Sequence, residues 1–164
     1  MFSFLKQKVH VSQYFIDRLE VLFRQEQTNI WKRLLKEALI VSDQEFNKAN
    51  IESFIDDMRA VHIQLLRTAL AKEYRSFEMH LAISSSLNSY LTKTNNLKLS
   101  EVSDLYNQAF GSSSTNGIFQ MVALFSRRLI GDVSNHPAMN ELNGYFYMVL
   151  RSIFDDLDRV KLTI

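Results

Sequence analysis

The sequence predicts an all-α protein, a single-domain bundle of five or six helices built around one long central helix. No glycine and no proline occurs between Asp43 and Thr94, a run of about 50 residues against a mean helix length of ~11–12. Apolar residues recur at helical spacing through almost all of this run. Hydrophobic residues make up 46% of the 164-residue chain, which is enough to fill the core of one helical domain.

Length, charge and cysteine content narrow the classes of protein to which the chain can belong. We expect one domain that spans residues 1–164. The absence of cysteine excludes a disulfide framework and a thiolate zinc site, and it fits a cytoplasmic protein. The formal net charge of +1 gives no general electrostatic attraction to nucleic acid. No run of ~18 apolar residues is present, so the sequence predicts no transmembrane segment.

Two helices are expected before the central segment. The first begins near Ser12, whose hydroxyl can cap it, while Val11 and Ile16 form a hydrophobic staple. Thr28 can cap the second helix, which turns three basic side chains outward: Lys32, Arg33 and Lys36. We interpret these as a solvated helix face; the alternative is a phosphate-binding patch that they form with the arginine pair at 127–128.

The central helix is expected at about residues 50–94, after a capping box at Ser42–Glu45. An unbroken helix of this length would be roughly 66 Å long, whereas a compact domain of this size has a radius of gyration of about 15 Å. The helix must therefore break or project, with Ser84–Ser86 as the weakest point and Thr94–Asn96 as its end. Two apolar stripes predict packing on more than one side: Ile51, Ile55, Met58, His62, Leu65 and Ala69 form the first, and Leu66, Leu70, Tyr74, Phe77 and Leu81 form the second.

Three shorter helices are expected after the central segment. Ser100 can cap a helix that ends where a flexible, Gly- and Ser-rich loop begins at 111–117. The next helix covers about residues 118–130. Pro137 suits the first position of the last helix, which is expected over 137–161.

The spacing of histidines and carboxylates argues against a metal site. His62 occupies a core position of the first stripe, where we interpret it as a hydrogen-bonded core histidine rather than a metal or haem ligand. His80 lies about 27 Å from it along a straight helix, so the two cannot share an ion. Glu73 is about 10.5 Å from His80 on the same face, and the Glu-x-x-His pair of di-iron bundles is absent. We predict no metal and no cofactor.

One short motif offers a candidate catalytic pair. Arg75 and His80 have Arg-x4-His spacing, and this stretch resembles the motif of HEPN-type ribonucleases, which are small, helical and often dimeric. The resemblance implies an arginine that holds phosphate and a histidine that acts as general acid or base. On a regular helix the two side chains point ~140° apart, so they converge only if the helix is irregular between them.

The leading functional hypothesis is a non-catalytic helical protein–protein interaction module, of the immunity, adaptor or antitoxin kind, that forms a homodimer. It rests on the double-striped central helix, on the abundant aromatic residues, and on the absence of recognisable nucleophile or nucleotide-binding motifs. One alternative is the HEPN-like ribonuclease that uses Arg75 and His80. Another is a bundle that binds a small molecule or lipid in a pocket lined by its Phe-rich helices. Residues 2–8, which mix Phe, Leu and Lys, can contact a membrane surface, or dock onto the bundle or a partner.

Overall fold

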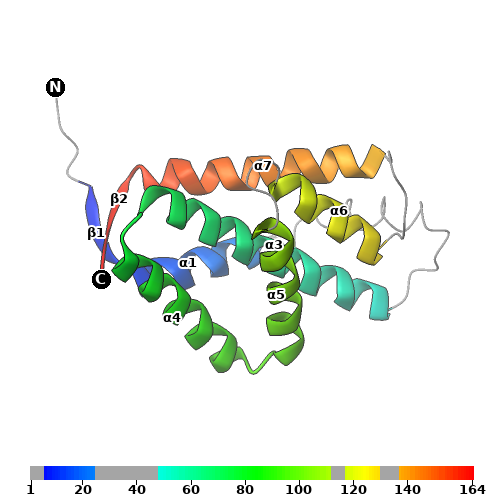
Figure 1. Cartoon of the computed structure of the whole chain (residues 1–164), viewed down its shortest axis with the longest axis horizontal. Helices are drawn as coiled ribbons and strands as arrows, with labels where there is room; N and C mark the ends of the chain where they lie inside the picture. Colours follow the sequence, from blue (N-terminus) through cyan, green and yellow to red (C-terminus); the bar gives the residue numbers. More distant parts are fainter. Residues whose placement is uncertain (1–5, 25–47, 112–116, 130–136) are drawn as a thin grey trace.

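The structure is a computed structural model that describes residues 6–24, 48–111, 117–129 and 137–164. Within these ranges it contains six helices and one two-stranded sheet, so the predicted all-α bundle is confirmed (Figure 1). The expected second helix and the capping box at Ser42–Glu45 lie outside the described residues. The elements are β1 (Gln7–His10), α1 (Val11–Phe23), α3 (Lys48–Glu73), α4 (Phe77–Thr94), α5 (Leu97–Gly111), α6 (Gly117–Leu129), α7 (Pro137–Leu157) and β2 (Val160–Thr163).

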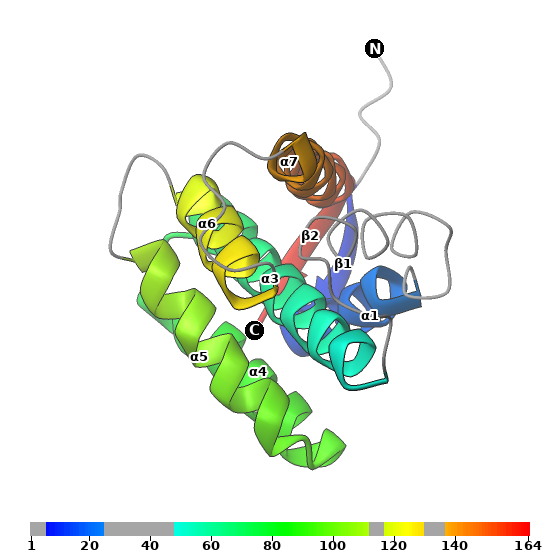
Figure 2. The same cartoon turned by 90° about the vertical axis from the view of Figure 1, so that its right-hand side faces the viewer.

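Helix α3 lies at the centre of the bundle. Helices α1, α5, α6 and α7 all contact it and surround it in the end-on view (Figure 2). Most side chains between Phe54 and Leu70 are buried, which confirms the predicted packing on more than one side. The second predicted stripe is not buried beyond α3, because Phe77 and Leu81 of α4 are 72% and 54% exposed.

The long segment is broken, but the break lies at Tyr74–Ser76 and not at the predicted Ser84–Ser86. Ser76 has extended backbone angles, and its hydroxyl accepts a hydrogen bond from the Met79 N–H at 3.2 Å. It is therefore the N-cap of α4. Glu78 in the first turn places a negative charge at the positive end of the helix dipole.

Two hydrogen bonds explain where the chain turns. The Tyr74 hydroxyl accepts a bond from the backbone N–H of Leu162 in β2 at 3.1 Å, so the connection is tied to the far end of the chain. Ser86 stays helical because its hydroxyl donates to the Ala82 carbonyl one turn earlier, at 2.7 Å. The serines at 84–86 are thus compatible with the interior of α4. The chain turns at 74–76, where Tyr74 contacts β2.

Two asparagines form the turn between α4 and α5. Asn95 adopts the left-handed conformation at φ 47° and ends α4, as predicted for Thr94–Asn96. The Asn96 side chain accepts a hydrogen bond from the Leu99 N–H at 2.9 Å. The predicted cap at Ser100 is therefore wrong, because Asn96 caps α5 about one turn earlier.

The two strands bring the ends of the described chain together (Figure 1). β1 pairs with β2 in parallel, with Val9 opposite Leu162. The predicted helix over 137–161 is wrong at its end, since α7 stops at Leu157 and the last residues alternate between apolar and polar, as a strand does. Because residues 7 and 8 belong to β1, the end of segment 2–8 docks onto the bundle itself.

The boundaries of the remaining helices follow the prediction closely, with one exception at α1. His10 rather than Ser12 caps α1, because the His10 Nδ1 accepts a hydrogen bond from the Ser12 N–H at 3.2 Å. Pro137 is the first residue of α7, as expected. The predicted loop 111–117 is narrower, since its first and last residues belong to α5 and α6. A Cβ at Gly117 would overlap the ring of Phe110, so glycine lets α6 begin against that ring.

Candidate functional site

His62 is a hydrogen-bonded core residue, in agreement with its interpretation from the sequence. It is fully buried; its Nδ1 donates to the Met58 carbonyl at 2.6 Å and its Nε2 accepts from the Tyr145 hydroxyl at 3.1 Å. Burial lowers the pKa of His62 from 6.5 to about 4, and the bond to the Met58 carbonyl only partly opposes this. The neutral imidazole therefore joins α3 to α7. Within the described ranges, no group of three or more His, Asp or Glu side chains is placed to hold a metal ion.

A second buried polar cluster joins α3, α5 and α6. The Asp57 carboxylate is fully buried and accepts hydrogen bonds from Arg128, at 2.5 and 3.2 Å, and from the Tyr106 hydroxyl at 2.6 Å. The bond to Asp57 raises the pKa of Arg128, while burial and the Asp57 charge raise that of Tyr106. Arg128 is thus paired with Asp57. It is therefore not available to the alternative phosphate-binding patch, to which the arginine pair at 127–128 was expected to contribute.

A cleft of about 300 Å³ with a mixed polar and apolar lining lies between α3, α4 and α5. It forms where the break at 74–76 turns α4 away from the axis of α3 (Figure 1). Its apolar lining comes from Ala71, Ile83 and Phe110. Its polar lining comes from all three helices: Gln64, Arg67 and Thr68 of α3, His80 and Ser84 of α4, and Asn107 of α5.

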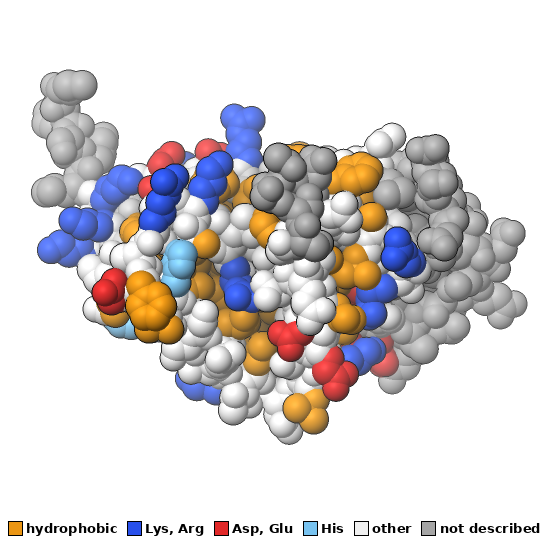
Figure 3. Space-filling view, viewed as in Figure 1, with side chains coloured by type: hydrophobic (Ala, Val, Ile, Leu, Met, Phe, Trp, Pro, Cys, Tyr) orange, Lys and Arg blue, Asp and Glu red, His pale blue; other side chains and the backbone are white. Residues whose placement is uncertain are grey.

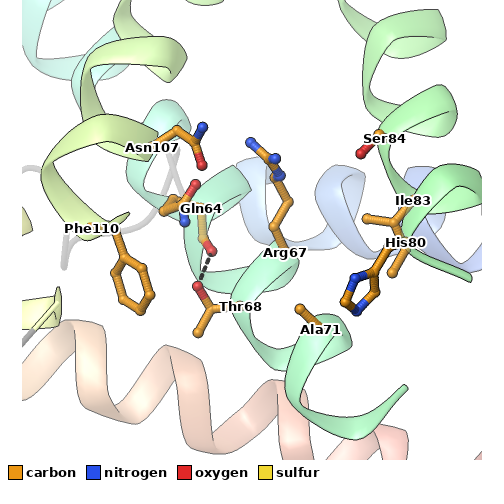
Figure 4. Close-up of a pocket in the computed structure, with 9 residues that line it drawn as sticks. All are labelled: Gln64, Arg67, Thr68, Ala71, His80, Ile83, Ser84, Asn107 and Phe110. Carbon is orange, nitrogen blue, oxygen red and sulfur yellow. Dashed lines mark hydrogen bonds between the residues drawn. The ribbon is translucent and has the colours of Figure 1, made fainter. Parts of the chain in front are cut away.

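One buried polar atom in this cleft lacks a hydrogen-bond partner among the described residues, and a half-buried arginine lies in the same cleft. Gln64 is 6% exposed, and its side-chain oxygen Oε1 is buried without a hydrogen-bond partner among the described residues. Arg67 is half-buried and extends from α3 into the space between α4 and α5 (Figure 4). Burial lowers the pKa of Arg67, and the negative charge of Asp104 partly offsets this. A buried polar atom without a partner costs free energy unless a bound molecule or water satisfies it.

The structure places Arg75 and His80 on different elements. Arg75 is exposed in the connection between α3 and α4, whereas His80 lies in the first turns of α4 and lines the cleft. The backbone between them is irregular, which is the condition that convergence would require. Arg75 is not among the residues that line the cleft, and the arginine that shares it with His80 is Arg67. The ribonuclease pair stays a prediction.

Helix α4 also presents an unpartnered surface, which we name the α4 outer face. It begins with the exposed side chains of Phe77 and Leu81, and hydrophobic side chains show over the start of α4 at the left of Figure 3. It continues as a shallow groove of about 590 Å³. The residues of the groove share one side of α4 at helical spacing, and they are Leu81, Ser84, Ser85, Asn88, Ser89, Thr92 and Lys93.

Sequence reasoning named His80 but missed the cleft around it. Arg67 and Gln64 carry no motif, and helical periodicity cannot say which other helices face them. The Phe-lined pocket expected for a lipid-binding bundle is not what this cleft offers, because Phe110 is its one phenylalanine among the described lining residues. None of the helices in the described part of the chain has both the length and the apolar character needed to cross a bilayer.

Comparison with known proteins assigns no family to this chain. No protein-family model matches it, and neither a curated protein nor a solved structure shows significant similarity to it.

Proposed function

We propose that the chain is a non-catalytic, cytoplasmic protein-interaction module, and that it binds a second copy of itself through the α4 outer face. The observation that carries this proposal is the exposure of Phe77 and Leu81, at 72% and 54%, on the first two turns of one helix face. Two large apolar side chains at i and i+4 form a continuous patch, and such patches on soluble proteins mark interaction sites.

The α4 outer face is complementary to itself. In an antiparallel pair centred on Ser85, Leu81 of each copy lies opposite Ser89 of the other, so a large side chain meets a small one. Phe77 and Glu78 at the start of one helix then lie beside Lys93 near the end of the other. Because Glu78 and Lys93 are both exposed, this arrangement places two opposite charges together at each end of the contact.

The size of this face sets the expected strength of the dimer. Helix α4 has 18 residues and is therefore about 27 Å long. A contact strip about 10 Å wide along it covers on the order of 270 Å², against the ~800 Å² per partner of a standard stable interface. We therefore expect a weak, reversible dimer rather than an obligate one.

Sedimentation velocity over a concentration series up to roughly 500 µM tests the proposal. The wild-type chain is expected to shift from monomer to dimer, and Leu81→Glu is expected to abolish the shift. The matched control is Met148→Glu, because Met148 is 62% exposed on α7 and the same charge is added away from α4. A wild type that stays monomeric, or a loss of dimer in both variants, would overturn the proposal.

A charge exchange separates this arrangement from other uses of the same face. Glu78→Lys and Lys93→Glu, made singly, are each expected to weaken the dimer, since each places like charges together. The double variant Glu78→Lys with Lys93→Glu is expected to restore it. A double variant that dimerises no better than either single one would contradict the antiparallel arrangement.

A further inference from the structure

The cleft between α3, α4 and α5 has the chemistry of a binding site, and Ser84 is the one described lining residue that it shares with the α4 outer face. Its polar lining converges from three separate helices, with Arg67 of α3 facing the space bordered by Ser84 of α4 and Asn107 of α5 (Figure 4). Its volume of about 300 Å³ lies at the lower end of the range of small-molecule sites. A ligand that fits it is therefore a small molecule.

Arg67 determines the charge of that ligand. A guanidinium offers five N–H donors in a planar fork that matches the oxygens of a phosphate or carboxylate group. Asp104, on the exposed side of α5, influences Arg67 through its charge, and no described residue accepts a hydrogen bond from the Arg67 side chain. Its donors therefore stay available to an oxyanion, although Asp104 weakens the attraction.

Gln64 determines a second property of the ligand. Its Oε1 is a buried acceptor without a described partner, and it needs a donor. The nearby Thr68 hydroxyl does not supply one, because it donates to the Gln64 backbone carbonyl at 2.8 Å. Because Oε1 is itself buried, the Gln64 side chain has to turn toward the cleft before a bound hydroxyl group can satisfy this oxygen, while the charged end of the same molecule lies on Arg67.

We propose that this cleft binds a small hydroxylated oxyanion, with the anionic group on Arg67 and a hydroxyl donating to Gln64 Oε1. Asn107 and Ser84 supply further hydrogen bonds at the sides of the cleft, and Ile83 and Phe110 cover the carbon chain. Phosphate monoesters and hydroxy acids both have this chemistry. The cleft and the proposed dimer share one lining residue, Ser84, and otherwise depend on different residues.

A matched ligand set tests the proposal on the full chain. Glycerol 3-phosphate, glycerate and glycerol share one carbon skeleton and differ in their anionic group. Each is titrated into ¹⁵N-labelled protein while amide shifts are followed by NMR. We expect one or both anions to shift the amides of 64–71, 80–84 and 104–110, and glycerol to leave them unchanged. The stronger anion identifies the group that Arg67 holds. Equal binding of glycerol, or no shift with either anion, would overturn the proposal.

Four variants assign the binding to named groups. Arg67→Gln is expected to lower the affinity for the anion at least about tenfold. The control Arg151→Gln makes the same change on the exposed side of α7 and is expected to leave this affinity unchanged. Asp104→Asn is expected to strengthen binding, because it removes the charge that competes for Arg67. Gln64→Leu is expected to weaken binding without lowering the melting temperature, since it removes an unpartnered buried atom. Affinity that is insensitive to Arg67, or lowered by Asp104→Asn, would contradict the assignment.

Discussion

Because His62 is buried in its neutral form, the stability of this protein should fall as the pH falls. The imidazole ring is fully buried and neutral, and burial lowers its pKa from 6.5 to about 4. In the unfolded chain the same ring is exposed and takes up a proton near pH 6.5. Between these two values the unfolded state binds more protons than the folded state, so acid favours unfolding.

The size of the effect follows from the difference between the two pKa values. Each pH unit in this window is worth about 1.4 kcal/mol for one group. Between pH 6.5 and about pH 4, His62 therefore removes about 3 kcal/mol from the free energy of unfolding. Above pH 6.5 its contribution is constant. This is a large part of the ~5–15 kcal/mol by which a typical domain is stable.

Urea denaturation followed by far-UV circular dichroism, at a series of pH values, measures this loss. The control is His62→Gln, whose side chain does not titrate in this window. That variant is expected to be less stable at neutral pH, because it loses the bonds to Met58 and Tyr145, but to lose about 3 kcal/mol less than the wild type on acidification. Parallel pH curves for the two proteins would refute a buried, neutral His62.

Two further predictions concern the buried Asp57 cluster and the absence of ribonuclease activity. Asp57→Ala should lower the free energy of unfolding by about 3 kcal/mol, because it leaves buried donors without their acceptor. Asp56→Ala removes an ion pair with an exposed lysine and should cost at most about 1 kcal/mol; equal losses in chemical denaturation would contradict the buried cluster. The purified protein is expected not to cleave a fluorogenic RNA. Cleavage that His80→Ala and Arg75→Ala each abolish, with the fold intact, would establish the ribonuclease alternative instead.

Local sequence signals were sufficient to predict where most of the described helices lie. The apolar spacing of the segments near residues 118–130 and 137–161 predicts a helix in each, and Pro137 marks a helix start, because these signals act within one or two turns. The identity of α3 as the central helix also follows from its pattern, since two apolar stripes require neighbours on two sides.

Features that depend on distant parts of the chain could not be predicted. The break at 74–76 contains no Gly or Pro, and its Tyr74 is bound to Leu162 near the other end of the sequence. The last residues form a strand only because β1 lies beside them. Each feature is stabilised by a partner that periodicity cannot identify, so the sequence placed the break among the serines and extended the last helix too far.

In the candidate site, too, local features could be predicted from the sequence and contacts between helices could not. The hydrogen-bonded state of His62 could be predicted from its core position on one helix. That Arg67 and His80 line the same cleft could not be predicted, because it depends on how α4 turns after the break. The exposure of Phe77 and Leu81 was likewise hidden, since their spacing continues a stripe that is buried in α3.

A single-cysteine crosslink tests the proposed α4–α4 dimer most directly. The chain has no cysteine, so Ser85→Cys introduces one thiol at the centre of the α4 outer face, and Gln108→Cys introduces one at an exposed position on α5. Under mild oxidation, Ser85→Cys is expected to form a disulfide-linked dimer rapidly, because the symmetric pair places its two thiols together. Leu81→Glu should suppress that crosslink. Equal crosslinking at both positions, or none at Ser85→Cys, would contradict self-association through α4.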